Sequence, residues 1–143
     1  FKREAAYYMA PFRINVGDRV VVEADRGENF GTVAEITDVK PEFNVPSAVI
    51  RRATHYDDAL KTSLVDREDS TTVSIQRLAE SLGLGIRVVD TEYQLDGNKL
   101  TVFFQSRVFV DFRKLQRSLF REHRCRIWLV NANEIRSDVA RLC

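Results

Sequence analysis

The sequence predicts an α+β fold with an N-terminal small β-barrel-like lobe, a helical connector and a C-terminal ββαβ lobe. Three observations support this. β-branched runs alternate with glycine-containing turns in the first third, leucines recur at helical spacing in the middle, and strand patterns flank one short helix near the end. We therefore divide the chain into residues 1–53, 54–85 and 86–143, which together form one domain.

Length and composition limit the possible number of domains and the class of protein. A chain of 143 residues that is 44% hydrophobic can build a core for one domain or for two small lobes packed as one. No apolar run approaches the ~20 residues of a membrane span, and the start lacks a signal-peptide pattern. The first residue is Phe1, so we expect a fragment of a longer protein. The two cysteines, Cys125 and Cys143, form no disulfide framework, which favours a cytoplasmic protein.

The first lobe is predicted to be a hairpin with a closing strand. A turn and β-branched run cover 16–23, a turn covers 25–29, the return strand covers 30–36, and Val49–Ile50 closes the sheet. Gly27 is expected to supply the positive φ of the turn. The glycine pattern is also typical of KOW and Tudor-type modules, which bind RNA or peptides. We interpret the lobe as structural because turn chemistry alone accounts for its glycines.

The connector is predicted to be helical. Thr54 to Asp57 has the form of a capping box, with Asp in place of the usual Glu or Gln. Leucines follow a helical repeat, and Gly83 and Gly85 end it in the manner of a C-cap. The segment 66–72 is poor in apolar residues. It is either an exposed stretch of one long helix or a break between two helices.

The C-terminal lobe begins with a hairpin and ends with a strand. Strands are predicted at 86–95 and 99–105, joined by a turn at Asp96-Gly97-Asn98, and a further strand at 126–130. The helix between them, residues 111–123, must cross from one strand to the next, so its apolar stripe packs on the sheet. That stripe consists of Phe112, Leu115, Leu119 and Phe120, and Asp111 is expected to be the N-cap residue.

This helix also concentrates positive charge. Residues 107–126 carry seven basic and two acidic side chains, a net charge of +5, whereas the whole chain has a net charge of +1. The candidate nucleic-acid-binding residues are Arg107, Arg113, Lys114, Arg117, Arg121 and Arg124. Three interpretations remain open: contact with RNA phosphates, docking to the acidic segment 57–80 of the same chain or of a neighbour, and a solvated face without a ligand.

Aromatic residues give a second, weaker indication. If Tyr93, Phe103 and Trp128 shared one open sheet face, they would offer a platform on which bases stack. The alternative is that they belong to the core. Alternation places Val89 and Leu95 on the face of Tyr93, which favours burial against the first lobe or the long helix.

Catalytic patterns are absent from the sequence. His55 and His123 lie near helix ends, Cys125 begins an apolar strand, and no nucleophile–base pattern, phosphate-binding glycine loop or paired metal ligands occur. A nuclease would need a carboxylate cluster. Asp90, Glu92 and Asp96 lie near one another, but we interpret them as a solvated edge. We therefore expect no enzyme activity, no metal and no cofactor.

Two blocks carry a family resemblance. The first is 16–23 with Arg26-Gly27 and 31–33, and the second is 96–100 followed by 110–115. In this order and separation the chain resembles the PSP-one C-terminal conserved domain, over about 7–140. Similar bacterial domains belong to a regulator that partners two small helical proteins and influences an mRNA-processing ribonuclease. Similar trypanosomatid domains occur in cycling-sequence mRNA-binding proteins.

The resemblance implies a role in RNA metabolism. We expect a non-catalytic RNA-binding or RNP-scaffolding domain of post-transcriptional regulation, with mRNA and the proteins of a regulatory complex as partners and no membrane. The alternative is a protein–protein interaction module that assembles such a complex without touching RNA. A homo-oligomer is left open. The bacterial form continues into a glycine- and cysteine-rich tail tied to iron–sulfur binding. Residues 133–140 resemble the approach to that tail, and the cysteine group is either missing or lies beyond the end of this fragment, so no cluster is carried over.

Overall fold

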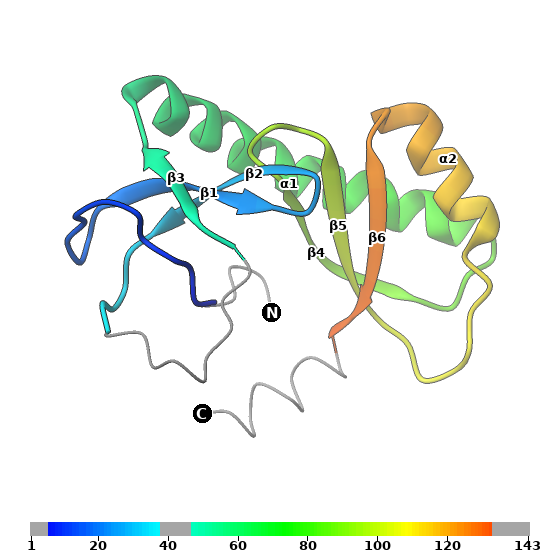
Figure 1. Cartoon of the computed structure of the whole chain (residues 1–143). Coiled ribbons are helices and arrows are strands. Elements are labelled where there is room, and N and C mark those ends of the chain that lie inside the picture. The colour runs from blue at the N-terminus through cyan, green and yellow to red at the C-terminus, as the bar shows by residue number, and fades with distance from the viewer. Residues whose placement is uncertain (1–5, 38–46, 133–143) are drawn as a thin grey trace.

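The computed structural model describes residues 6–37 and 47–132. It confirms the α+β class, with two three-stranded sheets and two helices (Figure 1). Residues 133–143, which follow the last predicted strand and include Cys143, lie outside the described residues. In the described part of the chain, no helix is both long enough and apolar enough to cross a membrane.

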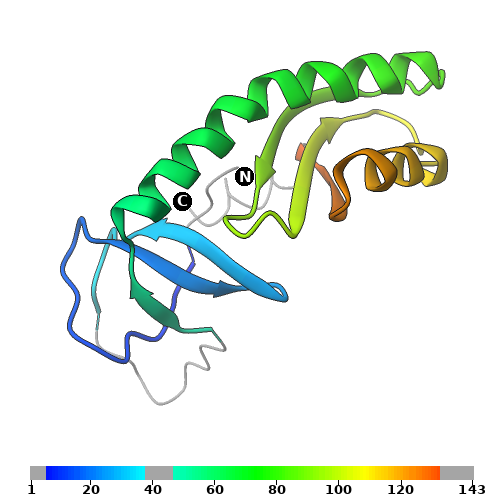
Figure 2. The same ribbon diagram turned by 90° about the horizontal axis from the view of Figure 1, so that it is seen from above.

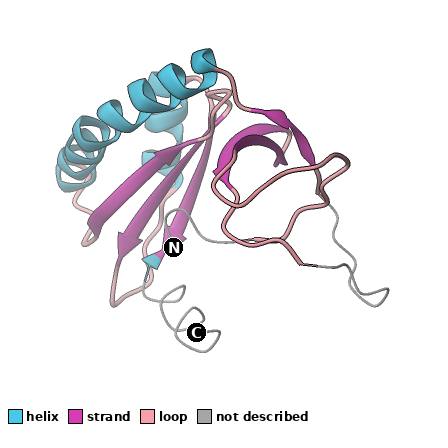
Figure 3. Ribbon diagram, turned by 90° about the vertical axis from the view of Figure 1, so that its left-hand side faces the viewer, coloured by secondary structure: helices cyan, strands magenta, loops and turns pink. Residues whose placement is uncertain are grey.

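The N-terminal lobe is a curved antiparallel sheet. Its strands are β1 (Arg19–Ala24), β2 (Gly27–Thr32) and β3 (Val49–Arg52), in the order β2-β1-β3. The sheet bends strongly (Figure 3), and within the described residues it does not close into a barrel. Val20, Val22 and Val49 form its small core. The hairpin is confirmed, although the return strand ends at Thr32 rather than at residue 36.

The β1–β2 turn differs from the prediction in one detail. The positive φ falls on Arg26, at 53°, and not on Gly27, which already belongs to β2. Gly27 is needed for another reason. A Cβ atom there would lie 1.8 Å from Asp96 Oδ2, so any side chain at this position would displace the Asp96 carboxylate.

The connector is one uninterrupted helix, α1 (His55–Ser81). The capping box is present, since the Thr54 hydroxyl accepts from the Asp57 N–H and the Asp57 carboxylate accepts from the Thr54 N–H. At the other end Gly83, with a φ of 71°, takes the left-handed conformation that follows many helices. The polar middle of α1 is not simply exposed. Glu68 and Thr71 are buried against the second sheet.

The C-terminal lobe has the predicted ββαβ order. It comprises β4 (Arg87–Tyr93), β5 (Lys99–Gln105), α2 (Arg113–His123) and β6 (Arg126–Asn131). β4 and β5 are antiparallel, whereas β6 runs parallel to β5 with α2 as the crossover. The main core lies between this sheet and the two helices, and includes Ile75 of α1, Leu100 and Val102 of β5, and Leu115 and Leu119 of α2.

Helix α1 runs along the β4 edge of this sheet (Figure 2). Its side chains satisfy backbone groups of that edge strand and of the residue before it. Gln76 Oε1 accepts from the Val88 N–H at 2.6 Å, and its Nε2 donates to the Ile86 carbonyl at 3.3 Å. Glu68 Oε1 accepts from the Tyr93 N–H at 3.3 Å. The polar middle of α1 thus covers a strand edge, which explains why it is poor in apolar residues.

The two lobes are joined by contacts between distant turns. Asp96 Oδ2 accepts from the Glu28 N–H at 2.8 Å. The guanidinium of Arg126, at the start of β6, pairs with Asp25 Oδ2 at 2.7 Å and lowers the pKa of that carboxyl. Asp96 is exposed, as the interpretation of a solvated edge expected, but it also has a structural role. It holds the first hairpin against the second lobe.

Candidate nucleic-acid interface

The candidate site is the outer face of α2. Leu115 and Leu119 are fully buried and fix which side of the helix faces the sheet. At 1.5 Å per residue, the helix of 11 residues is about 16 Å long. The basic side chains point away from the core because they are turned by roughly half a revolution from the two leucines. The sequence-predicted basic face is therefore present.

One of the six candidate cations is already paired. The Arg113 Nη2 lies 2.6 Å from Asp111 Oδ2, and the Arg113 guanidinium holds the pKa of that carboxyl at about 2. Asp111 is not the N-cap residue as predicted, because Phe112 occupies that position. Its carboxylate still accepts from the Arg113 N–H, at 3.1 Å. Arg113 is thus less available to an external anion than its neighbours.

The other five candidates have no carboxylate partner within the described residues. They are Arg107, Lys114, Arg117, Arg121 and Arg124, and all are exposed. Arg107 lies in the loop before α2, and the others lie on or directly after the helix. A cation without a local carboxylate keeps its full charge for an external anion. This part of α2 therefore presents uncompensated positive charge to solvent.

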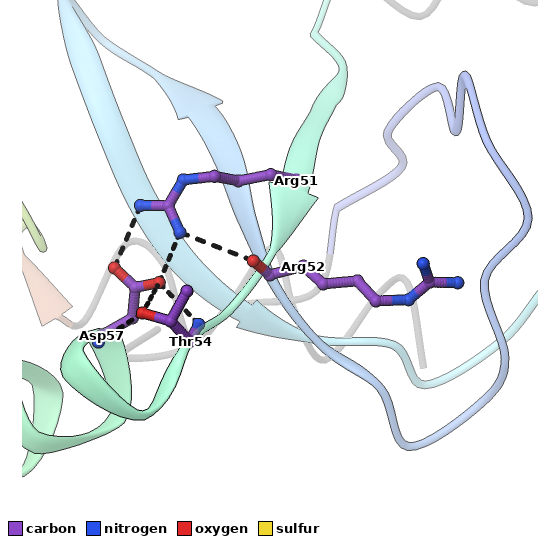
Figure 4. A network of polar contacts seen from close by, with 4 residues as sticks. All are labelled: Arg51, Arg52, Thr54 and Asp57. Atoms are coloured by element: carbon purple, nitrogen blue, oxygen red, sulfur yellow. Dashed lines mark hydrogen bonds and ion pairs between the residues drawn. The ribbon is translucent and has the colours of Figure 1, made fainter.

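The acidic segment of α1 does not neutralise this face in the described structure. Its first two acids pair with the N-terminal lobe instead. Arg51 makes a two-pronged contact with Asp57, in which Nη2 lies 3.0 Å from Oδ1 (Figure 4), and Arg19 lies 3.1 Å from Asp58. The Arg51 guanidinium and the Thr54 N–H lower the pKa of Asp57. These ion pairs hold the helix start to the first lobe.

Phe120 departs from its predicted place. We expected it in the apolar stripe, but 57% of the residue is exposed. It follows Leu119 directly and is turned by 100° from it, which brings it beside the arginines rather than into the core. With Gln116, Arg117, Arg121 and Arg124 it lines a shallow hollow of about 470 Å³. The sequence contains a signal for this position. When the helical wheel is centred on Leu115 and Leu119, Phe120 falls outside the buried side of the helix.

A second hollow adjoins the first at Gln116. It has a volume of about 390 Å³ and lies between α2 and β6, lined by Phe112, Gln116, Ile127, Trp128 and Leu129. Trp128 is 48% exposed, and the Lys99 ammonium lies 4.2 Å from its ring centroid. Sequence reasoning singled out Trp128 but not its neighbours, because the hollow forms only when β6 pairs beside the crossover helix.

The structure does not bring the three stacking candidates together. Tyr93 is 4% exposed and faces the helices, where its hydroxyl lies 2.9 Å from that of Thr71. Phe103 is 5% exposed. Only Trp128 has open ring surface, and a base can stack only on a ring that solvent reaches. The predicted aromatic platform thus reduces to Trp128, with Phe120 on the neighbouring helix face.

The remaining polar candidates lack the geometry of a reaction centre. Cys125 is buried, and this burial raises the pKa of its thiol, so little thiolate forms. Burial also lowers the pKa of His123, whose ring packs edge-on against Tyr93. Among residues 6–37 and 47–132, no group of three or more His, Cys, Asp or Glu side chains is placed to hold a metal ion.

Comparison with known proteins identifies the family. The model of the PSP1 C-terminal conserved region matches residues 47–131, which is more than half of the chain. The chain belongs to this family. The matched residues include α1, α2 and the whole second sheet, so the basic helix and both hollows lie inside the family region.

A curated protein that the chain matches is an uncharacterized protein of the fission yeast Schizosaccharomyces pombe. The two are 28% identical over 147 residues. The match covers 81% of this chain and 20% of the relative, so the chain spans about a fifth of that protein's length. No solved structure matches the chain significantly.

Proposed function

We propose that the chain is a non-catalytic RNA-binding domain of mRNA regulation that contacts RNA through the outer face of α2. The observation that carries the proposal is the group Lys114, Arg117, Arg121 and Arg124, exposed and without a carboxylate partner in the described residues. Such a group replaces counterions along a phosphate backbone. Two partly exposed aromatic rings, Phe120 and Trp128, lie in the adjoining hollows.

The arrangement suits a single strand better than a duplex. The α2 face is short, about 16 Å, and the aromatic rings beside it offer apolar surface to unpaired bases. In a duplex the bases are stacked on each other and only phosphates and sugar hydroxyls remain in reach. Membership of the PSP1 family supports a role in mRNA metabolism. In that role, a domain that binds RNA through one face leaves its other faces for the proteins of a ribonucleoprotein complex.

The test combines charge reversal with salt dependence. Arg117, Arg121 and Arg124 are changed together to Glu, and binding to a panel of 12-nucleotide single-stranded RNAs is measured by fluorescence polarisation at two salt concentrations. We expect the affinity to fall roughly 100-fold, since each lost phosphate contact is worth about 1 kcal/mol. For three contacts, the logarithmic salt slope should fall by roughly 2.

A charge-matched control comes from elsewhere on the chain. Lys61, Arg77 and Arg87, on α1 and β4, are changed to Glu to give the same change in net charge. Binding that survives in this control and is lost in the α2 variant supports the proposal. Equal losses in both variants, or an affinity that does not depend on salt, would contradict it.

A second candidate is a protein-interaction module without RNA contact. The observation that favours it is exposed apolar surface around α2. Phe109 is 97% exposed, Val108 67% and Phe120 57%, which is unusual for large apolar residues so close together in a chain. An interface built on these residues would resist salt. Val108→Ser combined with Phe109→Ser, two positions outside both hollows, should therefore weaken partner binding at high salt while leaving RNA affinity nearly unchanged.

A further inference from the structure

The two edges of the second sheet are treated differently. The β4 edge is covered by α1, whose Gln76 and Glu68 side chains bond the backbone N–H groups of Val88 and Tyr93. β4 also carries an irregularity between Val88 and Asp90, a common way to discourage further pairing. Within residues 6–37 and 47–132, no element covers β6 in this way. Among the described residues it pairs only with β5, and its register with β5 is regular.

The outward-facing backbone groups of β6 can be identified. The Arg126 N–H donates to the Asn98 carbonyl at 3.0 Å and so points toward β5. Because successive residues of a strand point their backbone groups to opposite sides, Ile127 and Leu129 direct N–H and C=O to the outer edge. The same two residues line the 390 Å³ hollow beneath α2. In the described part of the chain, a strand edge without a paired neighbour and a hollow lined mainly by apolar residues therefore lie side by side.

We propose that this edge binds an extended segment of a partner protein, in which acidic residues alternate with aliphatic ones, by addition as a fourth strand beside β6. The backbone of the segment pairs with Ile127 and Leu129. One set of its side chains enters the hollow against Phe112 and Gln116 of α2. This is the mode by which an exposed sheet edge recognises peptides, with the backbone supplying affinity and the adjacent pocket supplying specificity.

Charge selects an acidic segment. Arg117, Arg121 and Arg124 line the hollow that meets this one at Gln116, and none has a carboxylate partner in the described residues. Carboxylates of a strand beside β6 would meet this field favourably. The same charges oppose a second copy of the chain as occupant. Pairing of two β6 edges around a two-fold axis would bring two α2 faces of like charge together.

The proposal shares the positive charge of α2 with RNA binding but differs from it in the groups that carry the contact. Phosphates need only the arginine face of α2, whereas strand addition also needs the backbone of β6 and the hollow beside it. Two probes with the same net charge therefore separate the sites. One is a nine-residue peptide that alternates Glu and Val, with both ends blocked. The other is a short oligouridylate of equal charge.

The decisive experiment is amide hydrogen exchange followed by NMR on the whole chain. In the free protein the Ile127 and Leu129 amides should exchange much faster than the Trp128 amide, which points toward β5. Saturating peptide should slow exchange at Ile127 and Leu129 at least tenfold. Unchanged exchange at both amides under conditions where the peptide is bound would overturn the proposal.

Backbone methylation of the probe gives a matched test that leaves the protein unchanged. Methylation of alternate peptide amides removes the donors that face β6 in one series and those that face solvent in the other. We expect each methyl of the first series to weaken binding about fivefold, and those of the second series to have little effect. Equal effects of the two series would mean that the peptide does not add as a strand.

A protein variant tests the hollow itself. Gln116→Trp fills the space between α2 and β6 from an exposed position and should weaken peptide binding at least tenfold. Val73→Trp, at a half-exposed position on α1, adds the same bulk away from the edge and should leave binding unchanged.

Two results would assign the edge to another occupant and overturn the proposal. One is a concentration-dependent dimer that protects Ile127 and Leu129, and the other is their protection by oligouridylate.

Discussion

Two groups of arginines in this molecule have opposite surroundings. Arg19, Arg51 and Arg126 each meet a carboxylate from a different element, at Asp58, Asp57 and Asp25. Four cations of α2, Lys114, Arg117, Arg121 and Arg124, have no carboxylate partner in the described residues. The first group lies where the N-terminal lobe meets α1 and β6. The second lies on the solvent side of a helix whose other side is packed.

The difference shows that charge density along the sequence does not by itself mark a binding site. Arg126 lies two residues after Arg124, and a charge count treats them alike. Arg126 nevertheless joins the two lobes, whereas Arg124 lines a surface hollow. Carboxylates that fold back from distant parts of the chain decide which cations stabilise the fold and which remain for an anion. Variants in the two groups should therefore separate stability from binding.

The largest loss of stability is expected at the junction of β3 and α1. Asp57→Ala removes both the capping carboxylate and the partner of Arg51, and should lower the free energy of unfolding by about 2 kcal/mol at pH 7, as measured by urea denaturation. Asp69→Ala, on the exposed side of the same helix, is the control and should change it by less than about 0.5 kcal/mol. Equal losses would mean that the junction adds no stability beyond the helix itself.

The lowered pKa of Asp57 also predicts that the stability of the protein depends on pH in the acid range. Since the folded-state pKa of Asp57 lies below its ordinary value, its contribution is fully present above about pH 4 and is lost as the pH falls through the folded-state value. The stability of the wild-type protein should therefore fall between pH 4 and pH 2 more steeply than that of Asp57→Ala. Parallel curves for the two proteins would contradict this assignment.

A smaller loss is expected at the contact between the lobes. Gly27→Ala forces Asp96 away from the Glu28 N–H and should lower the free energy of unfolding by about 1 kcal/mol. Gly85→Ala is the matched control, since a Cβ atom there meets no other atom and its φ is not positive. Calorimetry of both variants tests the contact. A stabilised Gly27→Ala would show that the lobes dock without Asp96.

His123 should give a weaker effect of pH. Burial lowers its pKa, so the unfolded chain binds a proton more readily than the folded one. Stability should therefore decrease as the pH falls from 7 to 5, and be highest above the ordinary histidine pKa of about 6.5. His123→Phe keeps the ring contact with Tyr93 and should flatten this part of the curve. An unchanged pH profile in the variant would show that another group titrates there.

The smallest effect on stability is expected from the cations of α2. The Arg117, Arg121 and Arg124 triple change to Glu, which should abolish most RNA affinity, should shift the free energy of unfolding by less than about 1 kcal/mol. Exposed cations without local partners have little native interaction to lose. If thermal denaturation showed that the triple variant loses as much stability as Asp57→Ala, the α2 cations would have native partners, and the two groups of arginines would not differ in this way.

Local patterns predicted much of this fold. The capping box at Thr54 and Asp57, the single crossover helix and the turn at Asp96-Gly97-Asn98 are properties of neighbouring residues, and all are present. The sequence alone does not decide between one long helix and two shorter ones over 54–85, because the middle of this segment is polar. That middle is helical in the structure, and its Glu68 bonds the backbone of β4, as does Gln76 further along the helix.

What sequence reasoning missed depends on contacts between distant residues. Asp25 and Arg126 are 101 positions apart, and Glu28 and Asp96 are 68 apart, so no local pattern reveals either pair. The candidate site likewise has features that local sequence patterns predict and features that depend on distant contacts. Charge and periodicity predicted the basic face of α2, but the exposure of Phe120 and the hollow beside β6 depend on how the crossover helix lies over the sheet.

The parallel pairing of β5 with β6 carries a consequence for synthesis of the protein. A hairpin such as β4–β5 can form as soon as it leaves the ribosome, whereas a parallel partner must wait for the crossover helix and its own residues. β6 is the last strand of the described chain, and it supplies one wall of the hollow that meets the basic face at Gln116. The nascent chain therefore acquires its recognition surface only after the rest of the second sheet has been translated.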